Sequence, residues 1–437
     1  METVSVIGAG LAGCEAACQL ADRGIPVRLY EMKPEKMSPA HHYPGFGELV
    51  CSNSLKAKRL ESAAGMLKEE MRLFGSVILE AAGQCEVPAG GALAVERERF
   101  SDLVTAAVKA RQNIMVISEE VTALPEGKVI VATGPLTADR LAEQIQELCG
   151  GTLSFFDAAA PIVTAESVNM EVAFAASRYD RGGEDDYLNC PMNKEEYERF
   201  HAALVAAETA PLKEFDRDCF RVYEGCMPVE VMAKRGTDTI RFGPLKPMGL
   251  RDPRTGHRPW AVVQLRKENA VSSLYNLVGF QTNLKFPEQK RVFSLIPGLE
   301  NAEFVRYGVM HRNTFLDSPR LLNQHYQFKQ RPELFFAGQL CGGEGYLASA
   351  ASGILAGYNM ANLIEGKALL TLPPTCMMGA LSQYISDESI SCFQPMGCSM
   401  GLLPALPEPI RDKRLRYQRL AERGLADLRA VLEAEHS

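Results

Sequence analysis

A glycine-rich turn close to the N-terminus has the spacing that binds the phosphates of a dinucleotide. Between an apolar run and a helical pattern it comprises Gly8, Ala9, Gly10, Leu11, Ala12 and Gly13. Gly8 permits the tight turn, Gly10 lets a pyrophosphate approach the backbone, and Gly13 lets the helix pack close to the strand. The helix N-terminus then offers unpaired N–H groups and a partial positive charge to the phosphates.

An acidic residue completes this nucleotide motif. Glu31 stands 18 residues after Gly13, at the end of an expected second strand from Val27 to Tyr30. In dinucleotide-binding folds a carboxylate at this place accepts hydrogen bonds from the ribose hydroxyls. The first 31 residues therefore predict one strand–helix–strand unit with a nucleotide bound at its turn.

Two later segments favour FAD over NAD as this nucleotide. The apolar runs that end at Gly134 and Gly338 resemble the later signatures of FAD-containing flavoproteins of the two-dinucleotide-fold type. In that group the late glycine-rich loop lies against the flavin, which makes cofactor-binding candidates of Gly338, Gln339, Glu344 and Gly345. The chain has no second GxGxxG for a permanent nicotinamide domain and no Cys-x4-Cys pair after the first one. We expect one tightly held FAD.

Two of the twelve cysteines lie in sequences that can activate a thiol. Cys51 precedes Asn53 and Ser54, which we expect to cap a helix, and Cys226 lies just before Pro228, a favoured first helical residue. A helix N-terminus favours the thiolate, which is the nucleophilic form of cysteine. Spacing alone leaves open the alternative that both thiols are inert, because most cysteines are buried.

Composition places the chain among ordinary globular proteins, with the cytoplasm as the expected location. Its 437 residues predict two or three domains, and 46% apolar with 23% charged residues is typical of a globular chain. No apolar run approaches the roughly 20 residues of a membrane helix, and the N-terminus lacks the basic flank of a signal peptide. The cysteines are scattered without zinc-binding spacing, so we expect thiols and no metal. The formal net charge of −7 argues against broad nucleic-acid binding but allows a local basic surface.

The order of these patterns predicts an α/β protein with a Rossmann-like FAD-binding domain of the two-dinucleotide-fold type, interrupted by an inserted α+β domain. We place the first part of the FAD-binding domain at residues 1–180, the insertion at 181–325, and the second part with a helical tail at 326–437. The change to more charged and aromatic residues and shorter apolar runs after about residue 180 marks the insertion.

Other elements follow from local periodicity. Apolar residues at helical spacing predict one helix from about Leu55 to Phe74, and small residues predict another from Ser349 to Asn359. Within the insertion we expect short strands at Tyr275 to Phe280 and at Val292 to Ile296. The tail from about Pro409 reads as a charged helix with leucines on one side.

Several short segments follow the glycine turn in a characteristic order. They include Pro39-Ala-His-His42, Leu49-Val-Cys-Ser-Asn-Ser-Leu55, Val87-Pro-Ala-Gly-Gly-Ala-Leu93, Tyr187-Leu-Asn-Cys-Pro-Met192, Glu224-Gly-Cys-Met-Pro228, Tyr307-Gly-Val-Met-His-Arg-Asn-Thr-Phe315 and Ala350-Ala-Ser-Gly353. Together with the turn they resemble the folate/FAD-dependent tRNA (uracil-5-)-methyltransferase family over nearly the whole chain. This set is far more specific than the glycine turn alone.

The resemblance implies methylation of carbon 5 of the T-loop uridine in tRNA. Such enzymes take a one-carbon unit from methylenetetrahydrofolate and use FAD, reduced by NAD(P)H, to bring it to a methyl group. Thiolate addition at carbon 6 makes carbon 5 an enolate carbon that can attack this unit. Cys226 matches the cysteine assigned to uracil attack, and Cys51 matches a second functional cysteine that protects or relays the chemistry. The base that removes the carbon 5 proton stays open between Glu224, Glu344, His311 and water.

Two basic clusters in the insertion are candidates for phosphate contacts with RNA. One contains Lys285, Lys290 and Arg291, and the other contains Arg251, Arg254, His257 and Arg258. A solvated surface explains each cluster equally well. In the tail, interleaved acids favour a solvated helix face. Tyr346 is a candidate for stacking on a base, folate or flavin.

Two stretches depart from the family pattern. Asn283 and Phe286 stand where the family usually shows His and Trp, and Ala348 stands where a Glu is usual, in the late loop that also carries Cys341. These departures bear on the folate pocket, the RNA target and the catalytic rate. The alternative functions are the same chemistry on a ribosomal RNA uridine, and an FAD-containing RNA-binding or folding factor with little catalysis.

Overall fold

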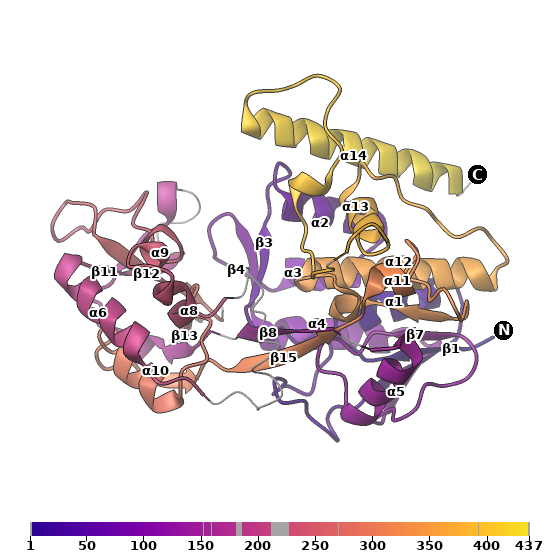
Figure 1. The fold of residues 1–437 in the computed structure, drawn as a ribbon, viewed down its shortest axis with the longest axis horizontal. Coiled ribbons are helices and arrows are strands. Elements are labelled where there is room, and N and C mark those ends of the chain that lie inside the picture. Colours follow the sequence, from indigo (N-terminus) through magenta and orange to yellow (C-terminus); the bar gives the residue numbers. More distant parts are fainter. Residues whose placement is uncertain are drawn as a thin grey trace.

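The computed structural model of the chain has two bodies, each built around its own sheet (Figure 1). It describes residues 2–151, 153–158, 160–180, 186–210, 227–269, 271–391 and 393–435. The larger body contains both ends of the chain, whereas the smaller one is built from the middle of the sequence. The prediction of an α/β protein with an insertion is confirmed.

A five-stranded parallel sheet forms the centre of the larger body. Its order is β16 (Leu334–Phe336), β7 (Val129–Val131), β1 (Val4–Ile7), β2 (Val27–Glu31) and β6 (Ile114–Ser118). The strand order reverses beside β1, which pairs with β2 on one side and with β7 on the other. In such sheets a ligand binds outside the carboxyl ends of the strands at this reversal. Every residue of β1, β7 and β16 is buried, as expected for parallel strands covered on both faces.

Two helices rich in small residues cross in close backbone contact. They are α1 (Leu11–Asp22) and α12 (Tyr346–Ile364). A Cβ added at Gly353 would lie 2.1 Å from the carbonyl oxygen of Ala12, and one at Gly357 would lie 2.7 Å from that of Ala16. Only glycine allows this approach. The crossing explains the small-residue composition that predicted a helix at Ser349 to Asn359.

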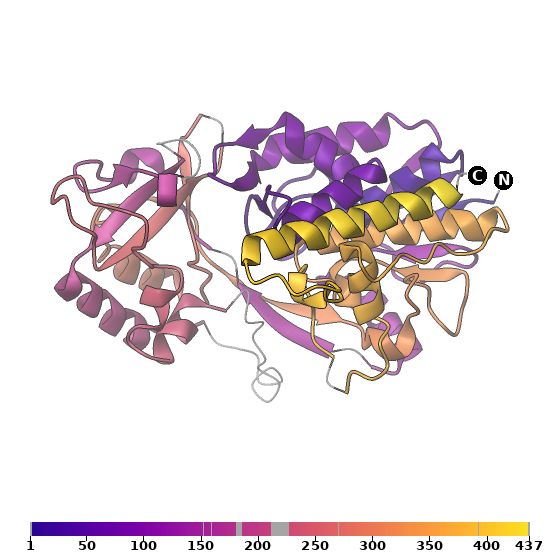
Figure 2. The same cartoon turned by 90° about the horizontal axis from the view of Figure 1, so that it is seen from above.

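The remaining helices of the larger body pack around this pair. They are α2 (Ala63–Leu73), α3 (Val77–Gln84), α4 (Arg97–Lys109), α5 (Asp139–Cys149), α11 (Ser318–Leu321), α13 (Met377–Tyr384) and α14 (Lys413–Glu435). Seen from above, α14 runs along the outer surface of the body (Figure 2). It packs on α2 with Leu420 and Leu428 buried. The prediction of a charged helix with an apolar side in the tail is confirmed.

The helix predicted from Leu55 to Phe74 is wrong in its first part. Residues Ser54–Ala57 form β3, which pairs with β5 (Ala92–Val95), and β5 in turn pairs with β4 (Glu86–Val87). The helix α2 begins only after Ser62, whose hydroxyl accepts a hydrogen bond from the backbone N–H of Gly65. The apolar spacing describes α2 correctly. Pairing with a distant strand decides the conformation before it, and no local pattern reports such a contact.

An antiparallel six-stranded sheet forms the smaller body. Its order is β10 (Phe174–Ala175), β11 (Tyr187–Met192), β12 (Ala261–Lys267), β13 (Leu274–Leu277), β9 (Ile162–Thr164) and β14 (Phe304–Arg306). The helices that pack with it are α6 (Lys194–Ala206), α8 (Val229–Lys234), α9 (Thr239–Phe242) and α10 (Phe286–Phe293). The predicted strand from Val292 to Ile296 is wrong, because α10 covers its beginning. The strand predicted from Tyr275 corresponds to β13.

A two-stranded ribbon of β8 (Leu153–Ala158) and β15 (Met310–Phe315) connects the two bodies. Short 3-10 turns complete the fold at Ala165–Ser167, Arg178–Asp180, Gly338–Cys341 and Met400–Leu402. The strands of the second sheet lie between residues 162 and 306, and the division of the chain at residues 181 and 325 stays a prediction. Across the described ranges, no helix combines the length and apolar character needed to cross a membrane.

Candidate functional site

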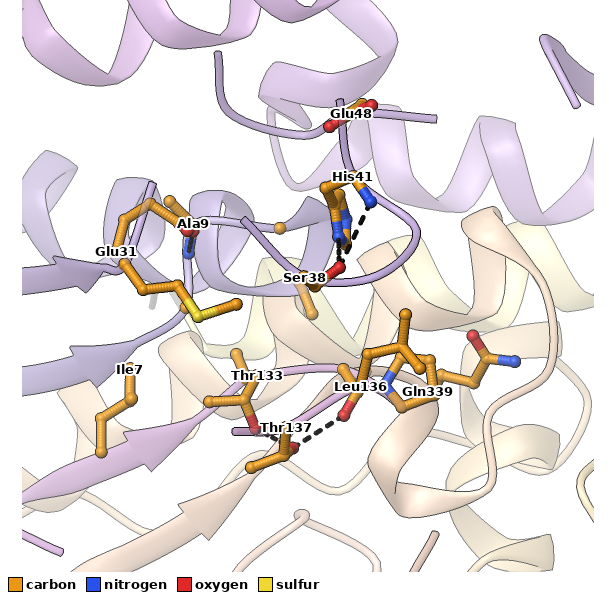
Figure 3. Close-up of a pocket in the computed structure, with 18 of the residues that line it drawn as sticks. Ile7, Ala9, Glu31, Ser38, His41, Glu48, Thr133, Leu136, Thr137 and Gln339 are labelled. Carbon is orange, nitrogen blue, oxygen red and sulfur yellow. Dashed lines mark hydrogen bonds between the residues drawn. The ribbon is translucent and has the colours of Figure 1, made fainter. Parts of the chain in front are cut away.

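A large cavity opens at the carboxyl ends of the parallel strands, beside the reversal of strand order (Figure 3). The space among its lining residues, open mouth included, is about 1400 Å³. Nine of the predicted cofactor residues line it, namely Gly8, Ala9, Gly10, Leu11, Ala12, Glu31, Gly134, Gly338 and Gln339. Cys51 lines the same cavity.

Each glycine of the first turn meets a different steric demand. Gly8 has a φ of +97°, and a Cβ on it would lie 2.7 Å from the carbonyl oxygen of Ala132. A Cβ on Gly13 would lie 1.8 Å from the carbonyl oxygen of Gly8. Gly10 has nothing within 4 Å of that position, and no side chain caps the start of α1. The turn is therefore closed on its protein side and open on its cavity side, which suits the approach of a phosphate.

Glu31 fastens this turn to the end of β2. One carboxylate oxygen accepts a hydrogen bond from the Ala9 N–H at 2.8 Å, and the other accepts one from the Lys33 N–H at 3.0 Å. Each carboxylate oxygen has a second lone pair. Acceptance from ribose hydroxyls therefore stays a prediction, and the structure adds a bracing role that the sequence did not reveal.

The loop after β2 contributes polar groups that the sequence analysis missed. The Lys33 ammonium donates to the carbonyl oxygens of Tyr43 and Gly45 and lies 3.6 Å from a carboxylate oxygen of Glu48. That oxygen is buried and has no hydrogen-bond partner among the described residues. Lys33 and Glu48 both line the cavity. This oxygen faces the Lys33 charge but accepts no hydrogen bond from the described residues, so it is available to a donor on a ligand.

Two polar pairs stand on different walls of the cavity (Figure 3). The Ser38 hydroxyl and His41 Nδ1 are 2.5 Å apart, and burial lowers the pKa of His41. The hydroxyls of Thr133 and Thr137 are 2.6 Å apart, in the turn that follows β7. The only sequence signal for these residues was their position after a predicted strand or within the His-His segment, because loops carry no periodicity.

The late glycine loop supports the wall beside Gln339. Gln339 donates from its side-chain nitrogen to Glu344 at 2.9 Å, and Gly345 directly precedes α12. The backbone N–H of Gly338 donates to the Ser352 hydroxyl at 2.7 Å. Glu344 therefore holds the Gln339 side chain and Gly345 stands at the start of α12, although neither residue lines the cavity itself.

Cys51 meets Tyr346 at the cavity wall. The tyrosine hydroxyl accepts hydrogen bonds from the backbone N–H groups of Cys51 and Ser52 at 2.9 and 3.1 Å, and lies 3.0 Å from Cys51 Sγ. Burial raises the pKa of Tyr346 well above its ordinary value. The prediction that Cys51 lies at a helix N-terminus is wrong, since β3 and not a helix follows it. The neutral phenol of Tyr346 adjoins this thiol, in place of the start of a following helix.

Several predicted residues lie outside the described part of the chain. Cys226 and Glu224 belong to a segment that the structure does not describe, and the side chain of His311 is likewise outside it. The helix α8 begins at Val229 with Pro228 as the preceding cap residue. The assignment of Cys226 as the nucleophile and the choice of a base stay predictions.

The basic clusters are partly neutralised by neighbouring acids. Lys285 pairs with Glu208 at 2.5 Å, Arg291 with Glu288 at 2.6 Å. Arg254 pairs with Asp252 at 2.8 Å. Three of the predicted cations are thus paired with acids, and a role of either cluster in phosphate binding stays a prediction.

The departures from the family pattern lie in two different places. Asn283 donates to the carbonyl oxygen of Ala210, and the Phe286 ring stacks on Tyr307 with centroids 4.8 Å apart, both in the smaller body. Cys341 and Ala348 are buried in the core of the larger body. Among the described residues, no group of three or more His, Cys, Asp or Glu side chains could hold a metal ion.

Comparisons with known proteins agree on one family. A family model described as "Glucose inhibited division protein A" matches residues 3–368. A protein of Acetivibrio thermocellus, named methylenetetrahydrofolate--tRNA-(uracil-5-)-methyltransferase TrmFO, is 60% identical over 431 residues, covering 98% of each chain. A protein of the same name from Brevibacillus brevis is 56% identical over 436 residues, 100% of this chain and 99% of the relative. The solved structure of Aquifex aeolicus GidA in its form I crystal matches with a TM-score of 0.70 at 18% identity, over 99% of this chain and 78% of that one.

Proposed function

The chain belongs to the glucose inhibited division protein A family and, within it, to the methylenetetrahydrofolate--tRNA-(uracil-5-)-methyltransferases, and on this premise we propose that it methylates carbon 5 of a uridine in tRNA. The carbon donor is methylenetetrahydrofolate, and the cofactor is FAD reduced by NAD(P)H. Full-length identity of 56% and 60% to enzymes of this name carries the proposal. Neither a ribosomal RNA target nor a non-catalytic folding factor has an observation in its favour.

The cavity fits a dinucleotide such as FAD. Gly10 leaves open space where a pyrophosphate approaches, the start of α1 is uncapped, and Glu31 keeps lone pairs for ribose hydroxyls. The Glu48 carboxylate oxygen, which accepts no hydrogen bond from the described residues, is a further acceptor for a ligand hydroxyl. When bound and reduced, FAD supplies the two electrons that convert a methylene into a methyl group.

The chain itself supplies the nucleophile and the surroundings of the reacting carbon. We assign Cys226 to attack on carbon 6 of the uracil, which gives carbon 5 its nucleophilic character. Cys51, in the cavity wall beside Tyr346, is the second functional cysteine. We leave the base that removes the carbon 5 proton unassigned.

The finer parts of the proposal concern the target and its place. We assign the T-loop uridine as the target, with no membrane and no metal involved, and the cytoplasm as the location. Because this uridine lies inside a folded loop, it must leave its stack to reach a buried cavity. We place the uridine beside Cys51 in the cavity wall, where the nearby Asn53 contacts Arg266 of the inserted sheet.

The direct test is a methylation assay. Purified protein is incubated with methylenetetrahydrofolate, NADPH and a tRNA transcript, and the digested RNA is scored for 5-methyluridine by mass spectrometry. We expect one methyluridine per transcript, lost when its T-loop uridine is replaced by cytidine. A parallel reaction with a ribosomal RNA fragment should give none, and methylation there alone would overturn the tRNA assignment.

Cysteine variants test the assigned roles. Cys226→Ala should lower the rate by roughly 1,000-fold or more, as expected for loss of a covalent nucleophile. Cys149→Ala is the matched control, because this half-buried thiol lies in α5 away from the cavity lining. Undiminished methylation by Cys226→Ala would show that the nucleophile is another group.

A further inference from the structure

The loop that carries Cys51 is held by arginines from two directions. Arg97, at the start of α4, donates to the carbonyl oxygens of Leu49 and Val50 at 2.8 and 2.9 Å. These contacts precede Cys51 in the chain. They come from the larger body and fix the backbone as it approaches the thiol.

The contacts that follow Cys51 come from the inserted sheet. Arg266, in β12, donates to the Asn53 side-chain oxygen at 2.8 Å and to the Ser52 hydroxyl at 2.9 Å. Asn53 returns a hydrogen bond to the carbonyl oxygen of Lys267 at 2.9 Å. Arg266 is 8% exposed and Asn53 is fully buried. A guanidinium can make both contacts at once because its donors form a rigid fork.

Glu268 joins the two sets of contacts. It follows β12 directly and pairs with Arg97 through both carboxylate oxygens, at 2.7 and 3.3 Å. Its side chain is 4% exposed. Buried ion pairs between elements contribute little net stability, because desolvation offsets their attraction, yet they define geometry sharply. The residues at the end of β12 therefore contact the larger body at the Cys51 loop through hydrogen bonds and an ion pair.

We propose that Arg266, together with the Arg97–Glu268 pair, positions Cys51 against the cavity, and that the inserted domain acts on the thiol through these contacts. The smaller body has its own apolar core and its own ribbon connection to the larger one, so this polar contact is not what folds it. The residues held are the immediate neighbours of the thiol, and a reacting group loses rate when it is displaced by about 1 Å. The proposal rests on the proposed function only in assuming that Cys51 takes part in the methylation reaction.

The test compares the rates at which individual cysteines react with iodoacetamide. Arg266→Lys keeps the charge but loses the fork, so the loop should loosen and Cys51 should be alkylated about tenfold faster. Glu268→Gln should raise the alkylation rate of Cys51 roughly threefold. It is the alternative test variant if Arg266→Lys folds poorly. Rates are read by mass spectrometry of the peptides, at matched flavin content and at a fixed pH.

One half-buried thiol away from the Cys51 loop serves as the internal reference. Cys149 should react at the parental rate in both variants, because it lies at the end of α5 and not in the released loop. Arg331→Lys is the matched control, since Arg331 likewise donates two hydrogen bonds, here to the backbone carbonyls of Pro125 and Gly127, away from Cys51. An unchanged Cys51 rate in both variants, or equal acceleration of Cys51 and Cys149, would overturn the proposal. Failure of methylation in the parental protein would remove the proposed function and leave this result standing.

Discussion

The parallel sheet and the inserted sheet contribute to the same site by different physical means. The parallel sheet forms the cavity with backbone turns at its strand ends, where glycines decide how closely segments approach. The inserted sheet contributes side-chain contacts from the end of one strand, β12, to a loop of the other body. The first contribution is steric, whereas the second is polar and joins side chains that lie 171 to 214 positions apart in the sequence.

This difference separates binding from positioning. A substitution that adds a Cβ where the turn has no room for one disrupts the turn, because packed backbone cannot move aside as a flexible side chain can. A polar contact between bodies can loosen by degrees while both bodies keep their cores. We therefore expect the largest effects at the glycine turn and the smallest at exposed charges of the insertion.

The largest effect should come from Gly13→Ala. The added Cβ would lie 1.8 Å from the Gly8 carbonyl oxygen, and relieving this clash requires separation of α1 from β1. We expect a loss of about 3 kcal/mol or more in the free energy of unfolding, measured by urea denaturation of the larger body. Gly83→Ala is the control, since that position in α3 has open space and should be neutral or stabilising. A Gly13→Ala protein as stable as the parent would contradict the claim that close backbone contact at this turn requires glycine.

The next effect should be on binding alone. Gly10 has nothing within 4 Å of its Cβ position and a φ of −74°, which alanine adopts freely. Gly10→Ala should therefore leave stability within about 0.5 kcal/mol of the parent. The methyl group would occupy the place of the phosphate approach, so the Kd for FAD should rise roughly 100-fold. Equilibrium dialysis measures it, and unchanged FAD affinity would show that the phosphates lie elsewhere.

The sequence predicts the steric part of the molecule better than the polar part. The glycine turn and the apolar strands follow local spacing, so Gly8, Gly13 and the strand before Gly134 were predicted correctly. Apolar spacing predicts a helix where β3 forms, because the partner strand β5 lies far along the chain. Lining groups such as Glu48 carry no periodic signal.

The contact between Arg266 and Asn53 shows the same limit more sharply. Each residue alone is an ordinary polar residue in the sequence, and their pairing exists only once both bodies are folded. Motif spacing reports what a short segment must do by itself, whereas a contact between domains depends on the whole topology. The resemblance to a family identified Cys51 as functional, but could not say what holds it.

A smaller effect should follow from pH in the larger body. Glu70 is buried and accepts hydrogen bonds from the backbone N–H groups of Met377 and Met378, and burial raises its pKa from 4.5 to about 7. Between these values the folded state keeps a proton that the unfolded chain releases, so stability is full below pH 4.5 and is lost as the pH rises through 7. We expect the free energy of unfolding to fall by roughly 1–3 kcal/mol from pH 5 to pH 8.

Glu70→Gln isolates this contribution. The variant cannot ionise, so its stability should change less between pH 5 and pH 8 than that of the parent, although it loses one of the two caps on α13. Glu15 is buried with a pKa also raised to about 7, and it should leave a residual slope. Calorimetry over this pH range measures the difference. An identical pH dependence in parent and variant would contradict the assignment to Glu70.

The smallest effect should come from an exposed ion pair of the inserted domain. The Arg291 guanidinium lowers the pKa of Glu288 to about 2, a shift as large as that of Glu70. Yet the Arg291 side chain is 50% exposed, and water and salt screen such a pair, so Arg291→Ala should cost less than about 0.5 kcal/mol. Urea denaturation at low and high salt measures this cost, which should vanish at high salt. A loss above about 1 kcal/mol would mean that exposed charges hold the smaller body together, contrary to a sheet stabilised by its apolar core.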